Sequence, residues 1–300
     1  MTPEPVAERI DVRKTYKLYV GGKFPRSESG RTYAVQGSDG RVLAQAALAS
    51  RKDARDAVVA ARSAVAGWSS ASAYNRGQVL YRVAEMLEGR SAQFAELVAQ
   101  AEGVGDAEAR AQVAAAVDRW VWYAGWTDKV AQVAGSANPV AGPYFNLSVP
   151  EPTGVVAVLA PQQSSLLGLT SVVAPVVATG NTCVVVSSFA RPLPAFALGE
   201  VLATSDVPGG VVNLLTGSAA ELGPWLASHR DVDAIDLTGA AALTSPTWGE
   251  LEAAASDTLT RVRRPDDLPD GVEPDWTAVP DIRRMLGFLE TKTVWHPKGR

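Results

Sequence analysis

The stretches Gly154-Val-Val-Ala-Val-Leu159 and Cys183-Val-Val-Val186 are two continuous apolar runs, and an apolar segment of helical length, 167–178, lies between them. Two further runs, 211–214 and 234–237, alternate with segments of helical length over 195–204 and 219–228. Strands that are apolar on both faces are typical of parallel sheets covered by helices on both sides. The sequence therefore predicts an α/β fold with a doubly wound parallel sheet.

The hydrophobic periodicity changes on either side of this region. Residues 15–50 alternate apolar and polar side chains and carry tight-turn glycines, which predicts short strands. From Asp53, expected as an N-cap, to residue 129, apolar residues recur three or four apart, which predicts a layer of helices. Residues 130–158 predict a β-hairpin that leads into the first apolar run, 282–288 one or two helical turns, and 289–295 a strand.

Proline and charge set apart the stretch 261–281, which predicts a linker. We therefore expect three parts in the chain. The first is a domain over residues 1–260 that includes the hairpin at about 130–150. The linker over 261–281 and a C-terminal segment over 282–300 follow it.

Composition excludes several functional classes. The 300 residues include 28 Lys and Arg against 32 Asp and Glu, and this net charge of −4 gives no overall attraction to nucleic acid or an anionic membrane. One cysteine cannot form a disulfide within the chain, and two histidines cannot build a His-rich metal site, so we expect a cytoplasmic protein without a metal. Neither a signal peptide nor a membrane span is expected. The N-terminus mixes both charge signs without an apolar core, and Gln162, Gln163, Thr170 and Pro175 interrupt the most apolar stretch.

Ordered motifs over about residues 16–245 resemble those of the NAD(P)-dependent aldehyde dehydrogenases. In chain order they are Tyr19-Val-Gly-Gly-Lys23, Tyr123-Ala-Gly-Trp126, Glu151-Pro-Thr-Gly-Val155, Ala174-Pro175 with Gly180-Asn-Thr182, Val207-Pro-Gly-Gly-Val-Val-Asn213, and Leu237-Thr-Gly239. The tail Leu289-Glu-Thr-Lys-Thr-Val294 is similar to the family's C-terminal oligomerisation strand. A stretch about the size of the family's catalytic domain is missing between Thr244 and Ile282. The resemblance implies that residues 1–260 are a cofactor-type domain whose hairpin, with the tail, forms an oligomerisation element.

Residues that the family's chemistry requires are changed in this chain. The enzymes attack the aldehyde with a thiolate, but Cys183 corresponds to an apolar strand position and is expected in the core. The oxyanion-binding Asn of the family's Pro-Trp-Asn motif corresponds to Gln163, whose extra methylene displaces the donor. After the cofactor loop, Leu243-Thr-Ser-Pro-Thr-Trp248 keeps no counterpart of the family's general-base Glu. We therefore expect no catalytic residue.

The positions that the resemblance assigns to NAD are also changed. The Lys and Glu that bind the adenosine ribose correspond to Val186 and Phe189, which cannot hydrogen-bond a diol. At the pyrophosphate position, Gly239 is followed by Ala240 in place of a serine, and Thr244 replaces a second glycine. We expect no bound cofactor, or NAD binding that is weak.

Together these features predict a pseudoenzyme: a non-catalytic aldehyde dehydrogenase-like subunit, similar to the silent second half of double-domain family members. Its expected partner is a catalytically competent aldehyde dehydrogenase or another copy of the chain, joined through Leu289, Thr291, Thr293, Val294 and Trp295. The alternative for this strand is that it folds back on its own hairpin. Two other functions remain open: a reshaped nucleotide- or metabolite-binding module, and an NAD(P)-dependent aldehyde oxidoreductase with an atypical site.

Overall fold

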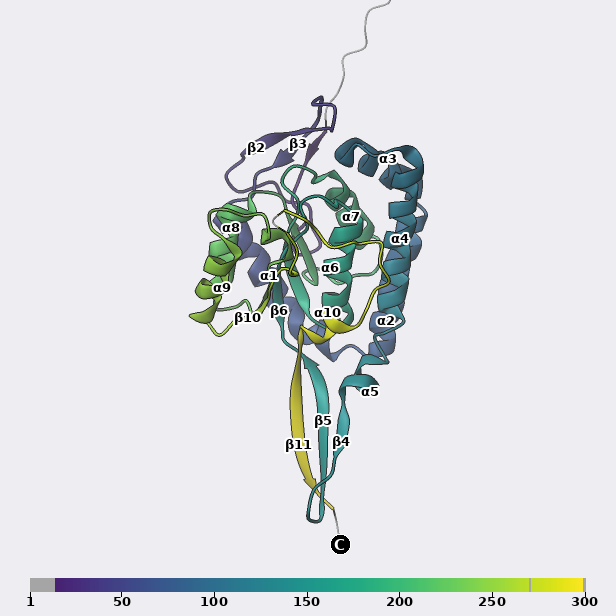
Figure 1. Cartoon of the computed structure of the whole chain (residues 1–300), viewed down its shortest axis with the longest axis vertical. Helices are drawn as coiled ribbons and strands as arrows, with labels where there is room; N and C mark the ends of the chain where they lie inside the picture. The colour runs from purple at the N-terminus through teal and green to yellow at the C-terminus, as the bar shows by residue number, and fades with distance from the viewer. Residues whose placement is uncertain (1–13, 270, 299–300) are drawn as a thin grey trace, which may run out of the picture.

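A five-stranded parallel sheet lies at the centre of the computed structural model, which describes residues 14–269 and 271–298 (Figure 1). The strand order is β10-β9-β6-β7-β8, and every neighbouring pair is parallel. The strands are β6 (Val155–Leu159), β7 (Thr182–Val186), β8 (Val212–Leu215), β9 (Ala234–Asp236) and β10 (Arg261–Arg263). The predicted α/β fold with a doubly wound parallel sheet is confirmed.

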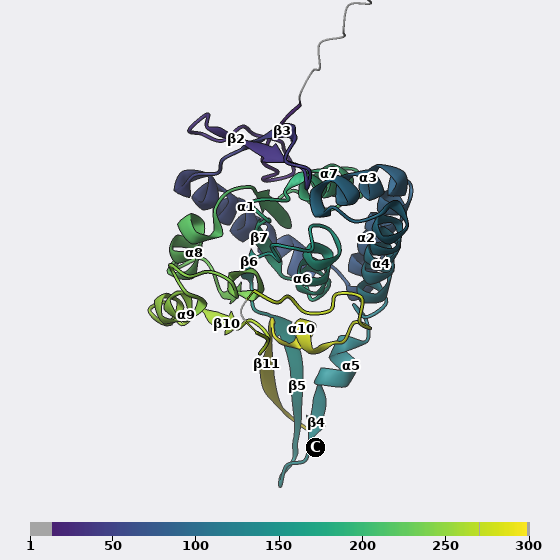
Figure 2. The same ribbon diagram turned by 45° about the horizontal axis from the view of Figure 1, so that its top comes forward.

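Helices cover both faces of this sheet (Figures 1 and 2). One face carries α6 (Leu167–Ala178) and α7 (Leu193–Ala203), with α2 (Ala73–Glu88), α3 (Ser91–Glu102) and α4 (Asp106–Ala124) outside them. The other face carries α1 (Arg51–Ser70), α8 (Ala219–Ala227) and α9 (Trp248–Ser256). Strand side chains alternate between the two layers: Val156 packs in the first apolar cluster, and Val155 and Ala157 pack in the second. Burial on both faces explains why the strands are continuous apolar runs.

Helix α1 begins after Ser50, so the predicted N-cap at Asp53 is wrong by three residues. Ser50 Oγ accepts the Asp53 N–H at 3.3 Å, and the Asp53 carboxylate accepts the Ser50 N–H at 2.8 Å. The same carboxylate accepts the Ser27 hydroxyl at 2.7 Å and the Glu28 N–H at 3.0 Å. Serine and aspartate are both good N-caps, and here the serine takes that position while the aspartate completes a capping box.

A small sheet at one end of the body contains β1 (Thr15–Tyr16), β2 (Thr32–Gln36) and β3 (Val42–Ala47), in the order β1-β3-β2 (Figure 1). Short strands were predicted for this region. Asn213 of β8 attaches the segment around Gly21 to the central sheet, because its Oδ1 accepts the Gly21 N–H at 2.9 Å. Its Nδ2 donates to the carbonyls of Cys183 and Gly210. Gly21 and Asn213, which belong to two of the motifs shared with the family, therefore have a structural role.

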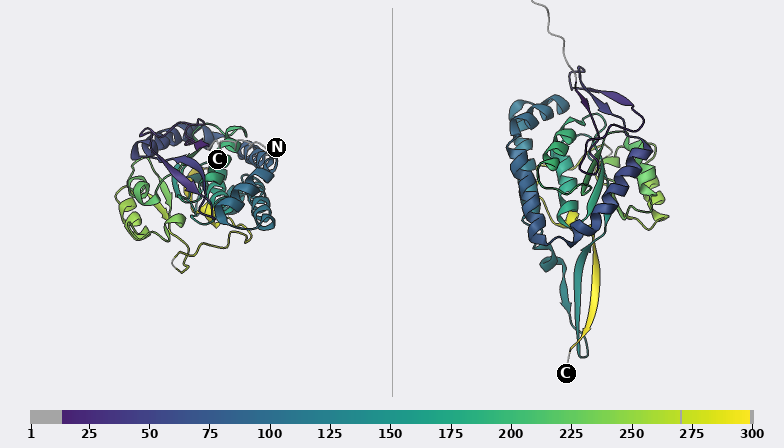
Figure 3. Two further views of the ribbon diagram at one scale, coloured as in Figure 1. Left: turned by 90° about the horizontal axis from the view of Figure 1, so that it is seen from above. Right: turned by 180° about the vertical axis from the view of Figure 1, so that it is seen from behind.

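At the opposite end, a three-stranded antiparallel sheet projects from the body (Figures 1 and 3). Its strands are β4 (Ser136–Asn138), β5 (Tyr144–Pro152) and β11 (Leu289–Pro297), in the order β11-β5-β4. The hairpin predicted over 130–158 is confirmed for β4 and β5, but its first residues form helix α5 (Val130–Ala134). Val130 is buried against the helical layer and its N–H donates to the Trp126 carbonyl at 3.1 Å, which favours a helical turn there.

Strand β11 pairs with β5 along its whole length, from Leu289 opposite Pro152 to Pro297 opposite Tyr144. The alternative that the tail folds back on its own hairpin is therefore confirmed, because the edge of β5 supplies its pairing partner. The predicted helical turns precede the strand as α10 (Arg283–Leu286), and the side chains of Met285 and Phe288 are fully buried. The last two residues of the predicted C-terminal segment lie outside the described part.

The stretch expected as a linker begins inside the central sheet. Arg261–Arg263 form β10, because Val262 packs against the second apolar cluster and Arg261 reaches the Leu289 carbonyl at 2.9 Å. The following residues 264–281, of which Asp270 lies outside the described part, run across α6 towards α4 and return to α10 (Figures 1 and 2). We call these residues the strap. The strap lies against the body, and residues 261–263 of the stretch expected as a linker belong instead to the central sheet.

The expectation that the N-terminus carries no signal peptide concerns mostly residues 1–13, which lie outside the described part. Among the residues that are described, no helix has both the length and the apolar character required to cross a membrane.

Candidate functional site

Cys183, the only cysteine of the sequence, lies in the second position of β7, between β6 and β8. Its side chain is fully buried in the first apolar cluster. Burial raises the pKa of the thiol to about 12, since a thiolate is poorly solvated there. A protonated, inaccessible thiol cannot act as a nucleophile.

Gln163 lies in the loop between β6 and α6, and its side chain is turned towards the strap. Its Nε2 donates to the Gly271 carbonyl at 2.7 Å. The N–H groups of Gln162, Gln163 and Ser164 all donate to the Glu273 carboxylate, at 2.5, 2.7 and 3.1 Å. The donors around the predicted oxyanion position are therefore engaged by a carboxylate and a carbonyl of this chain.

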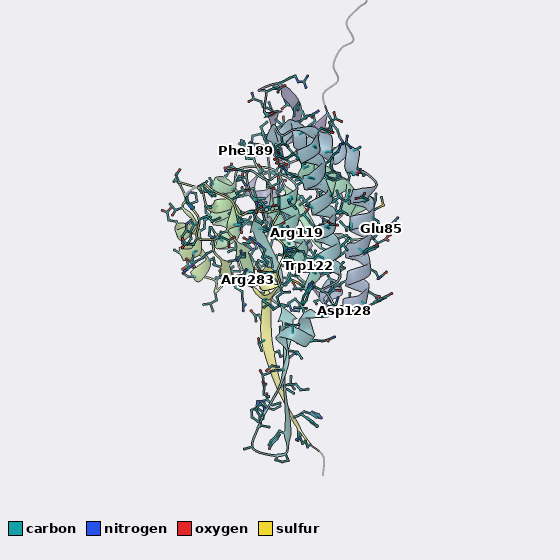
Figure 4. All side chains as sticks on the ribbon, turned by 45° about the vertical axis from the view of Figure 1, so that its right-hand side comes forward. Glu85, Arg119, Trp122, Asp128, Phe189 and Arg283 are labelled. Atoms are coloured by element: carbon teal, nitrogen blue, oxygen red, sulfur yellow. The ribbon has the colours of Figure 1, made fainter. Side chains whose placement is uncertain are left out.

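Val186 and Phe189, the positions aligned with the ribose anchors, lie in different environments. Val186 is fully buried in the second apolar cluster. Phe189 is 42% exposed, and its ring stacks on that of Tyr33, with 4.5 Å between centroids and 7° between planes. Tyr33 Oη donates to the Phe189 carbonyl at 3.0 Å, and burial raises the pKa of Tyr33. Figure 4 shows Phe189 in the upper part of the body, away from Arg119 and Arg283. Neither of these two side chains has an atom that can accept a hydrogen bond from a ribose hydroxyl.

Gly239 and Ala240 form a short 3-10 turn with Thr238 that is pressed against the end of β6. A Cβ on Gly239 would lie 1.9 Å from the Ala160 carbonyl oxygen, so only glycine fits this approach. Ala240 is fully buried in the second apolar cluster, whereas Thr244 is exposed. The close packing of the turn explains the retained glycine without a cofactor.

The N-terminus of the next helix, α9, is capped by residues of the helix itself. Thr247 donates to Glu250 Oε2 through its N–H at 2.7 Å and its hydroxyl at 3.0 Å, and these bonds hold the pKa of Glu250 below its usual value. The anion-binding end of α9 thus already carries a carboxylate. Together with Val186, Phe189 and Ala240, it does not fit the family's dinucleotide.

Beneath the strap, Arg263 and Arg284 flank the fully buried carboxylate of Asp236, and Arg119 binds the strap. Asp236 Oδ1 accepts the hydroxyl of Thr238 at 2.5 Å, and its Oδ2 lies 3.2 Å from Arg284 Nη1 and 3.8 Å from Arg263 Nε. Arg119 Nη2 donates to the carbonyls of Trp276 and Ala278, at 2.5 and 3.1 Å. Burial lowers the pKa of Arg284, and Asp236 opposes that shift. The cluster joins β9, β10, α4, α10 and the strap.

Two cavities flank Trp276 of the strap. One has a volume of about 660 Å³ and lies between α4, the start of α6 and residues 271–277. The other, of about 390 Å³, is lined by Arg119, Arg263 and Arg284. In the part of the chain that the structure describes, no group of three or more His, Cys, Asp or Glu side chains is arranged to hold a metal ion.

The tail residues predicted for oligomerisation lie on both faces of β11. Leu289, Thr291, Thr293 and Trp295 share one face, where Thr293 Oγ1 lies 2.9 Å from Ser148 Oγ. Val294 lies on the other face, directly opposite Leu147. That second face also carries Phe145 and Val149, and these four apolar side chains are 41–54% exposed.

Sequence reasoning missed the strap residues Glu273 and Trp276 and the buried pair of Asp236 with Arg284. The sequence could have indicated the role of Asp236, because an aspartate within an apolar strand needs a buried partner for its charge. Glu273 had none, since its contact with residues 162–164 depends on the path of an irregular segment.

Comparisons with known proteins agree with this fold. A model described as "Aldehyde dehydrogenase family" matches residues 24–262. Cytosolic 10-formyltetrahydrofolate dehydrogenase of Mus musculus is 32% identical over 244 residues, which cover 79% of this chain and 27% of that protein. Aldehyde dehydrogenase family 2 member B4, mitochondrial, of Arabidopsis thaliana is 34% identical over 227 residues, covering 74% and 42%.

Solved structures give the same result. PnpE from Pseudomonas sp. WBC-3 superposes with a TM-score of 0.78 at 29% identity, covering 83% of this chain and 50% of that one. An NAD+ complex of an aldehyde dehydrogenase from Bacillus cereus has a TM-score of 0.76 at 26% identity, with the same coverage. The chain spans about a quarter to a half of the length of these proteins. On the match over residues 24–262 and the shared fold, the chain belongs to the aldehyde dehydrogenase family.

Proposed function

We propose that the chain is a non-catalytic aldehyde dehydrogenase-like subunit that assembles with a catalytically competent aldehyde dehydrogenase or with another copy of itself. The observation that carries this proposal is the projecting sheet of β4, β5 and β11, whose strand β11 forms an outer edge over residues 289–297 (Figure 3). Within the described residues, no strand pairs with that edge. An unpaired edge of this length favours strand addition from a second chain.

The apolar face of the projecting sheet supports the same proposal. Phe145, Leu147, Val149 and Val294 lie together on it and are all exposed by two fifths or more. The opposite face is mixed: Asn138 Nδ2 donates to Ser148 Oγ at 2.8 Å, and the exposed rings of Tyr144 and Trp295 contact each other on the same face. A contiguous apolar patch on a thin sheet is typical of a surface that a partner covers. In this proposed subunit the central sheet and its helices provide the body, and the hairpin of β4 and β5 together with β11 provides the joining sheet.

The absence of catalysis in the proposal rests on the described residues around the central sheet. Cys183 is buried and protonated, and the donors near Gln163 are engaged by Glu273 and Gly271. NAD binding is at best weak in this account, since Val186 and Phe189 offer no polar anchor. An NAD(P)-dependent oxidoreductase with an atypical site has the least support, because Cys183 would need to reach the surface from β7. A cytoplasmic location remains part of the proposal, consistent with a single reduced cysteine.

A metabolite-binding module is the second candidate. The cavity of about 660 Å³ next to Trp276 favours it, since this volume suits a small organic ligand. Its lining combines apolar side chains such as Val104 and Leu167 with Gln112 and Arg191. Saturable binding of a metabolite by a chain that remains monomeric with its native companions would favour this module over the assembling subunit.

Native mass spectrometry of the chain purified with its native companions tests the proposed function. We expect a complex that contains more than one polypeptide. Leu147→Glu, which places a charge on the apolar face, should weaken the complex, whereas Thr291→Glu, on the opposite face of the same sheet, should have a smaller effect. If the wild type and both variants all have the mass of a single chain, the proposal is contradicted.

A further inference from the structure

We propose that the strap, residues 264–281, is an autoinhibitory contact that closes a trough at the carboxyl ends of the central strands. Glu273 acts as its latch by filling a nest of backbone N–H groups in the way that a free carboxylate would. This inference concerns the body of the molecule and does not depend on how the projecting sheet assembles.

The latch has four donors for one carboxylate. Glu273 Oε1 accepts the N–H groups of Gln162 and Gln163 at 2.5 and 2.7 Å. Its Oε2 accepts the Ser164 N–H and the Trp276 indole N–H, both at 3.1 Å. Successive backbone N–H groups that converge on one point form a concavity for anions, and hydrogen bonds to an ionised acceptor are the stronger kind.

The body holds the nest in shape without the strap. Ser188 Oγ donates to the Gln162 carbonyl at 2.8 Å, and Arg191 donates to the Gln163 carbonyl. On the far side, Glu102 of α3 accepts both the N–H and the hydroxyl of Ser165 at 2.6 Å. Because these partners belong to α3 and to the segment after β7, the N–H groups at 162–164 stay directed at the same point when the strap leaves.

Apart from Glu273, the strap is attached mainly by polar contacts and by one aromatic side chain. Between β10 and α10 it forms no helix or strand within its described residues. Its side chains Leu268, Val272 and Val279 are 40%, 48% and 87% exposed, whereas Trp276 packs against the first apolar cluster. The carbonyls of Trp276 and Ala278 accept from Arg119, and that of Gly271 accepts from Gln163. Asp266 forms ion pairs with Arg263 and Arg284, and the Trp276 ring lies 5.2 Å from the Arg284 guanidinium. A segment with little buried apolar area opens locally at lower cost than the sheet unfolds.

Displacement of the strap changes what the body exposes. Pro274, Asp275 and Trp276 line both the 660 Å³ and the 390 Å³ cavities. Their departure joins the two cavities into one trough that runs from α4 to the ends of β9 and β10. In open α/β sheets this carboxyl edge is where ligands bind. The strap therefore decides whether the trough and its carboxylate nest are available.

Hydrogen exchange followed by mass spectrometry tests the latch on the full chain. In Glu273→Ala, exchange should rise about tenfold or more in the strap and at residues 162–164, since charge-assisted hydrogen bonds are lost there. The matched control is Asp267→Ala, which removes an exposed carboxylate from the strap itself and should leave exchange in the strap and at residues 162–164 unchanged.

Sodium acetate provides the second arm of the test. It should restore slow exchange at residues 162–164 in Glu273→Ala but leave the strap open, whereas sodium chloride at equal ionic strength should restore neither. Unchanged strap exchange in Glu273→Ala, or equal effects of acetate and chloride, would overturn the proposal. If the alanine variant does not fold, Glu273→Gln, which keeps the side-chain volume and removes the charge, carries the same comparison with the same outcomes.

Discussion

The carboxylate of Asp236 lies 3.2 Å from the guanidinium Nη1 of Arg284, and this ion pair joins the end of β9 to helix α10. Asp236 is fully buried, and the Arg284 side chain is 12% exposed. Helix α10 leads directly into β11, so the pair fixes the base of the projecting sheet on the body. Asn181 adds a second link, because its Nδ2 donates to the Phe288 carbonyl at 2.8 Å.

Asp236→Asn should lower the free energy of unfolding by about 3 kcal/mol, because it leaves Arg284 and its neighbour Arg263 without their buried counter-charge. Urea unfolding measures this difference. Asp231→Asn is the control, since Asp231 is exposed and lies 4.0 Å from Arg62; its effect should stay within about 0.5 kcal/mol. Equal unfolding midpoints for the two variants would show that the pair does not hold the C-terminal segment.

Cys183 should not react with a thiol reagent in the folded protein near pH 8. Burial raises the pKa of its thiol from 9.0 to about 12, so almost no thiolate is present, and the sulfur is inaccessible. Denaturant should restore the reaction, and Cys183→Ser should leave assembly intact. Steady NADH production from an aldehyde by the pure chain, abolished by Cys183→Ala, is the result that would refute this.

Calorimetry with NAD should show no saturable binding at low micromolar concentration. Loss of two or three hydrogen bonds at positions 186, 189 and 240 lowers the affinity by about a hundredfold or more relative to a site that has them. Phe189→Ala, which frees the space of the ring without adding a polar group, should not create binding. A low-micromolar dissociation constant in either protein is incompatible with the proposed loss of the site.

Alkaline pH should destabilise the protein through its buried tyrosines. Burial raises the pKa of Tyr19 and of Tyr123 from 10.0 to about 12, because the phenolate is poorly solvated in the core. A raised folded-state pKa means stability that is complete below pH 10 and is lost as the pH rises towards 12. Unfolding free energies measured on both sides of this window, with absorbance of the tyrosinate as the second signal, check the prediction; unchanged stability near pH 12 would contradict it.

The central sheet was predictable because each of its strands is buried on both faces and leaves a continuous apolar run. The strand of the tail was also predictable from its alternation, but its partner was not, since the edge at which a strand pairs is not encoded in the strand itself. The contact of Glu273 with the N–H groups at 162–164 joins residues more than one hundred positions apart. Nothing in the local pattern of the strap indicates that contact.

The measurement that tests the central claim most directly is the solution mass of the full chain against that of a chain ending at Glu290. This end point keeps Met285, Phe288 and Leu289, which are buried in the body, and removes most of β11. We predict a mass above that of one chain for the full protein, alone or with its aldehyde dehydrogenase partner, and the mass of a single chain after truncation. A full chain that stays monomeric with its companions, or a truncated chain that keeps the same assembled mass, would contradict the account.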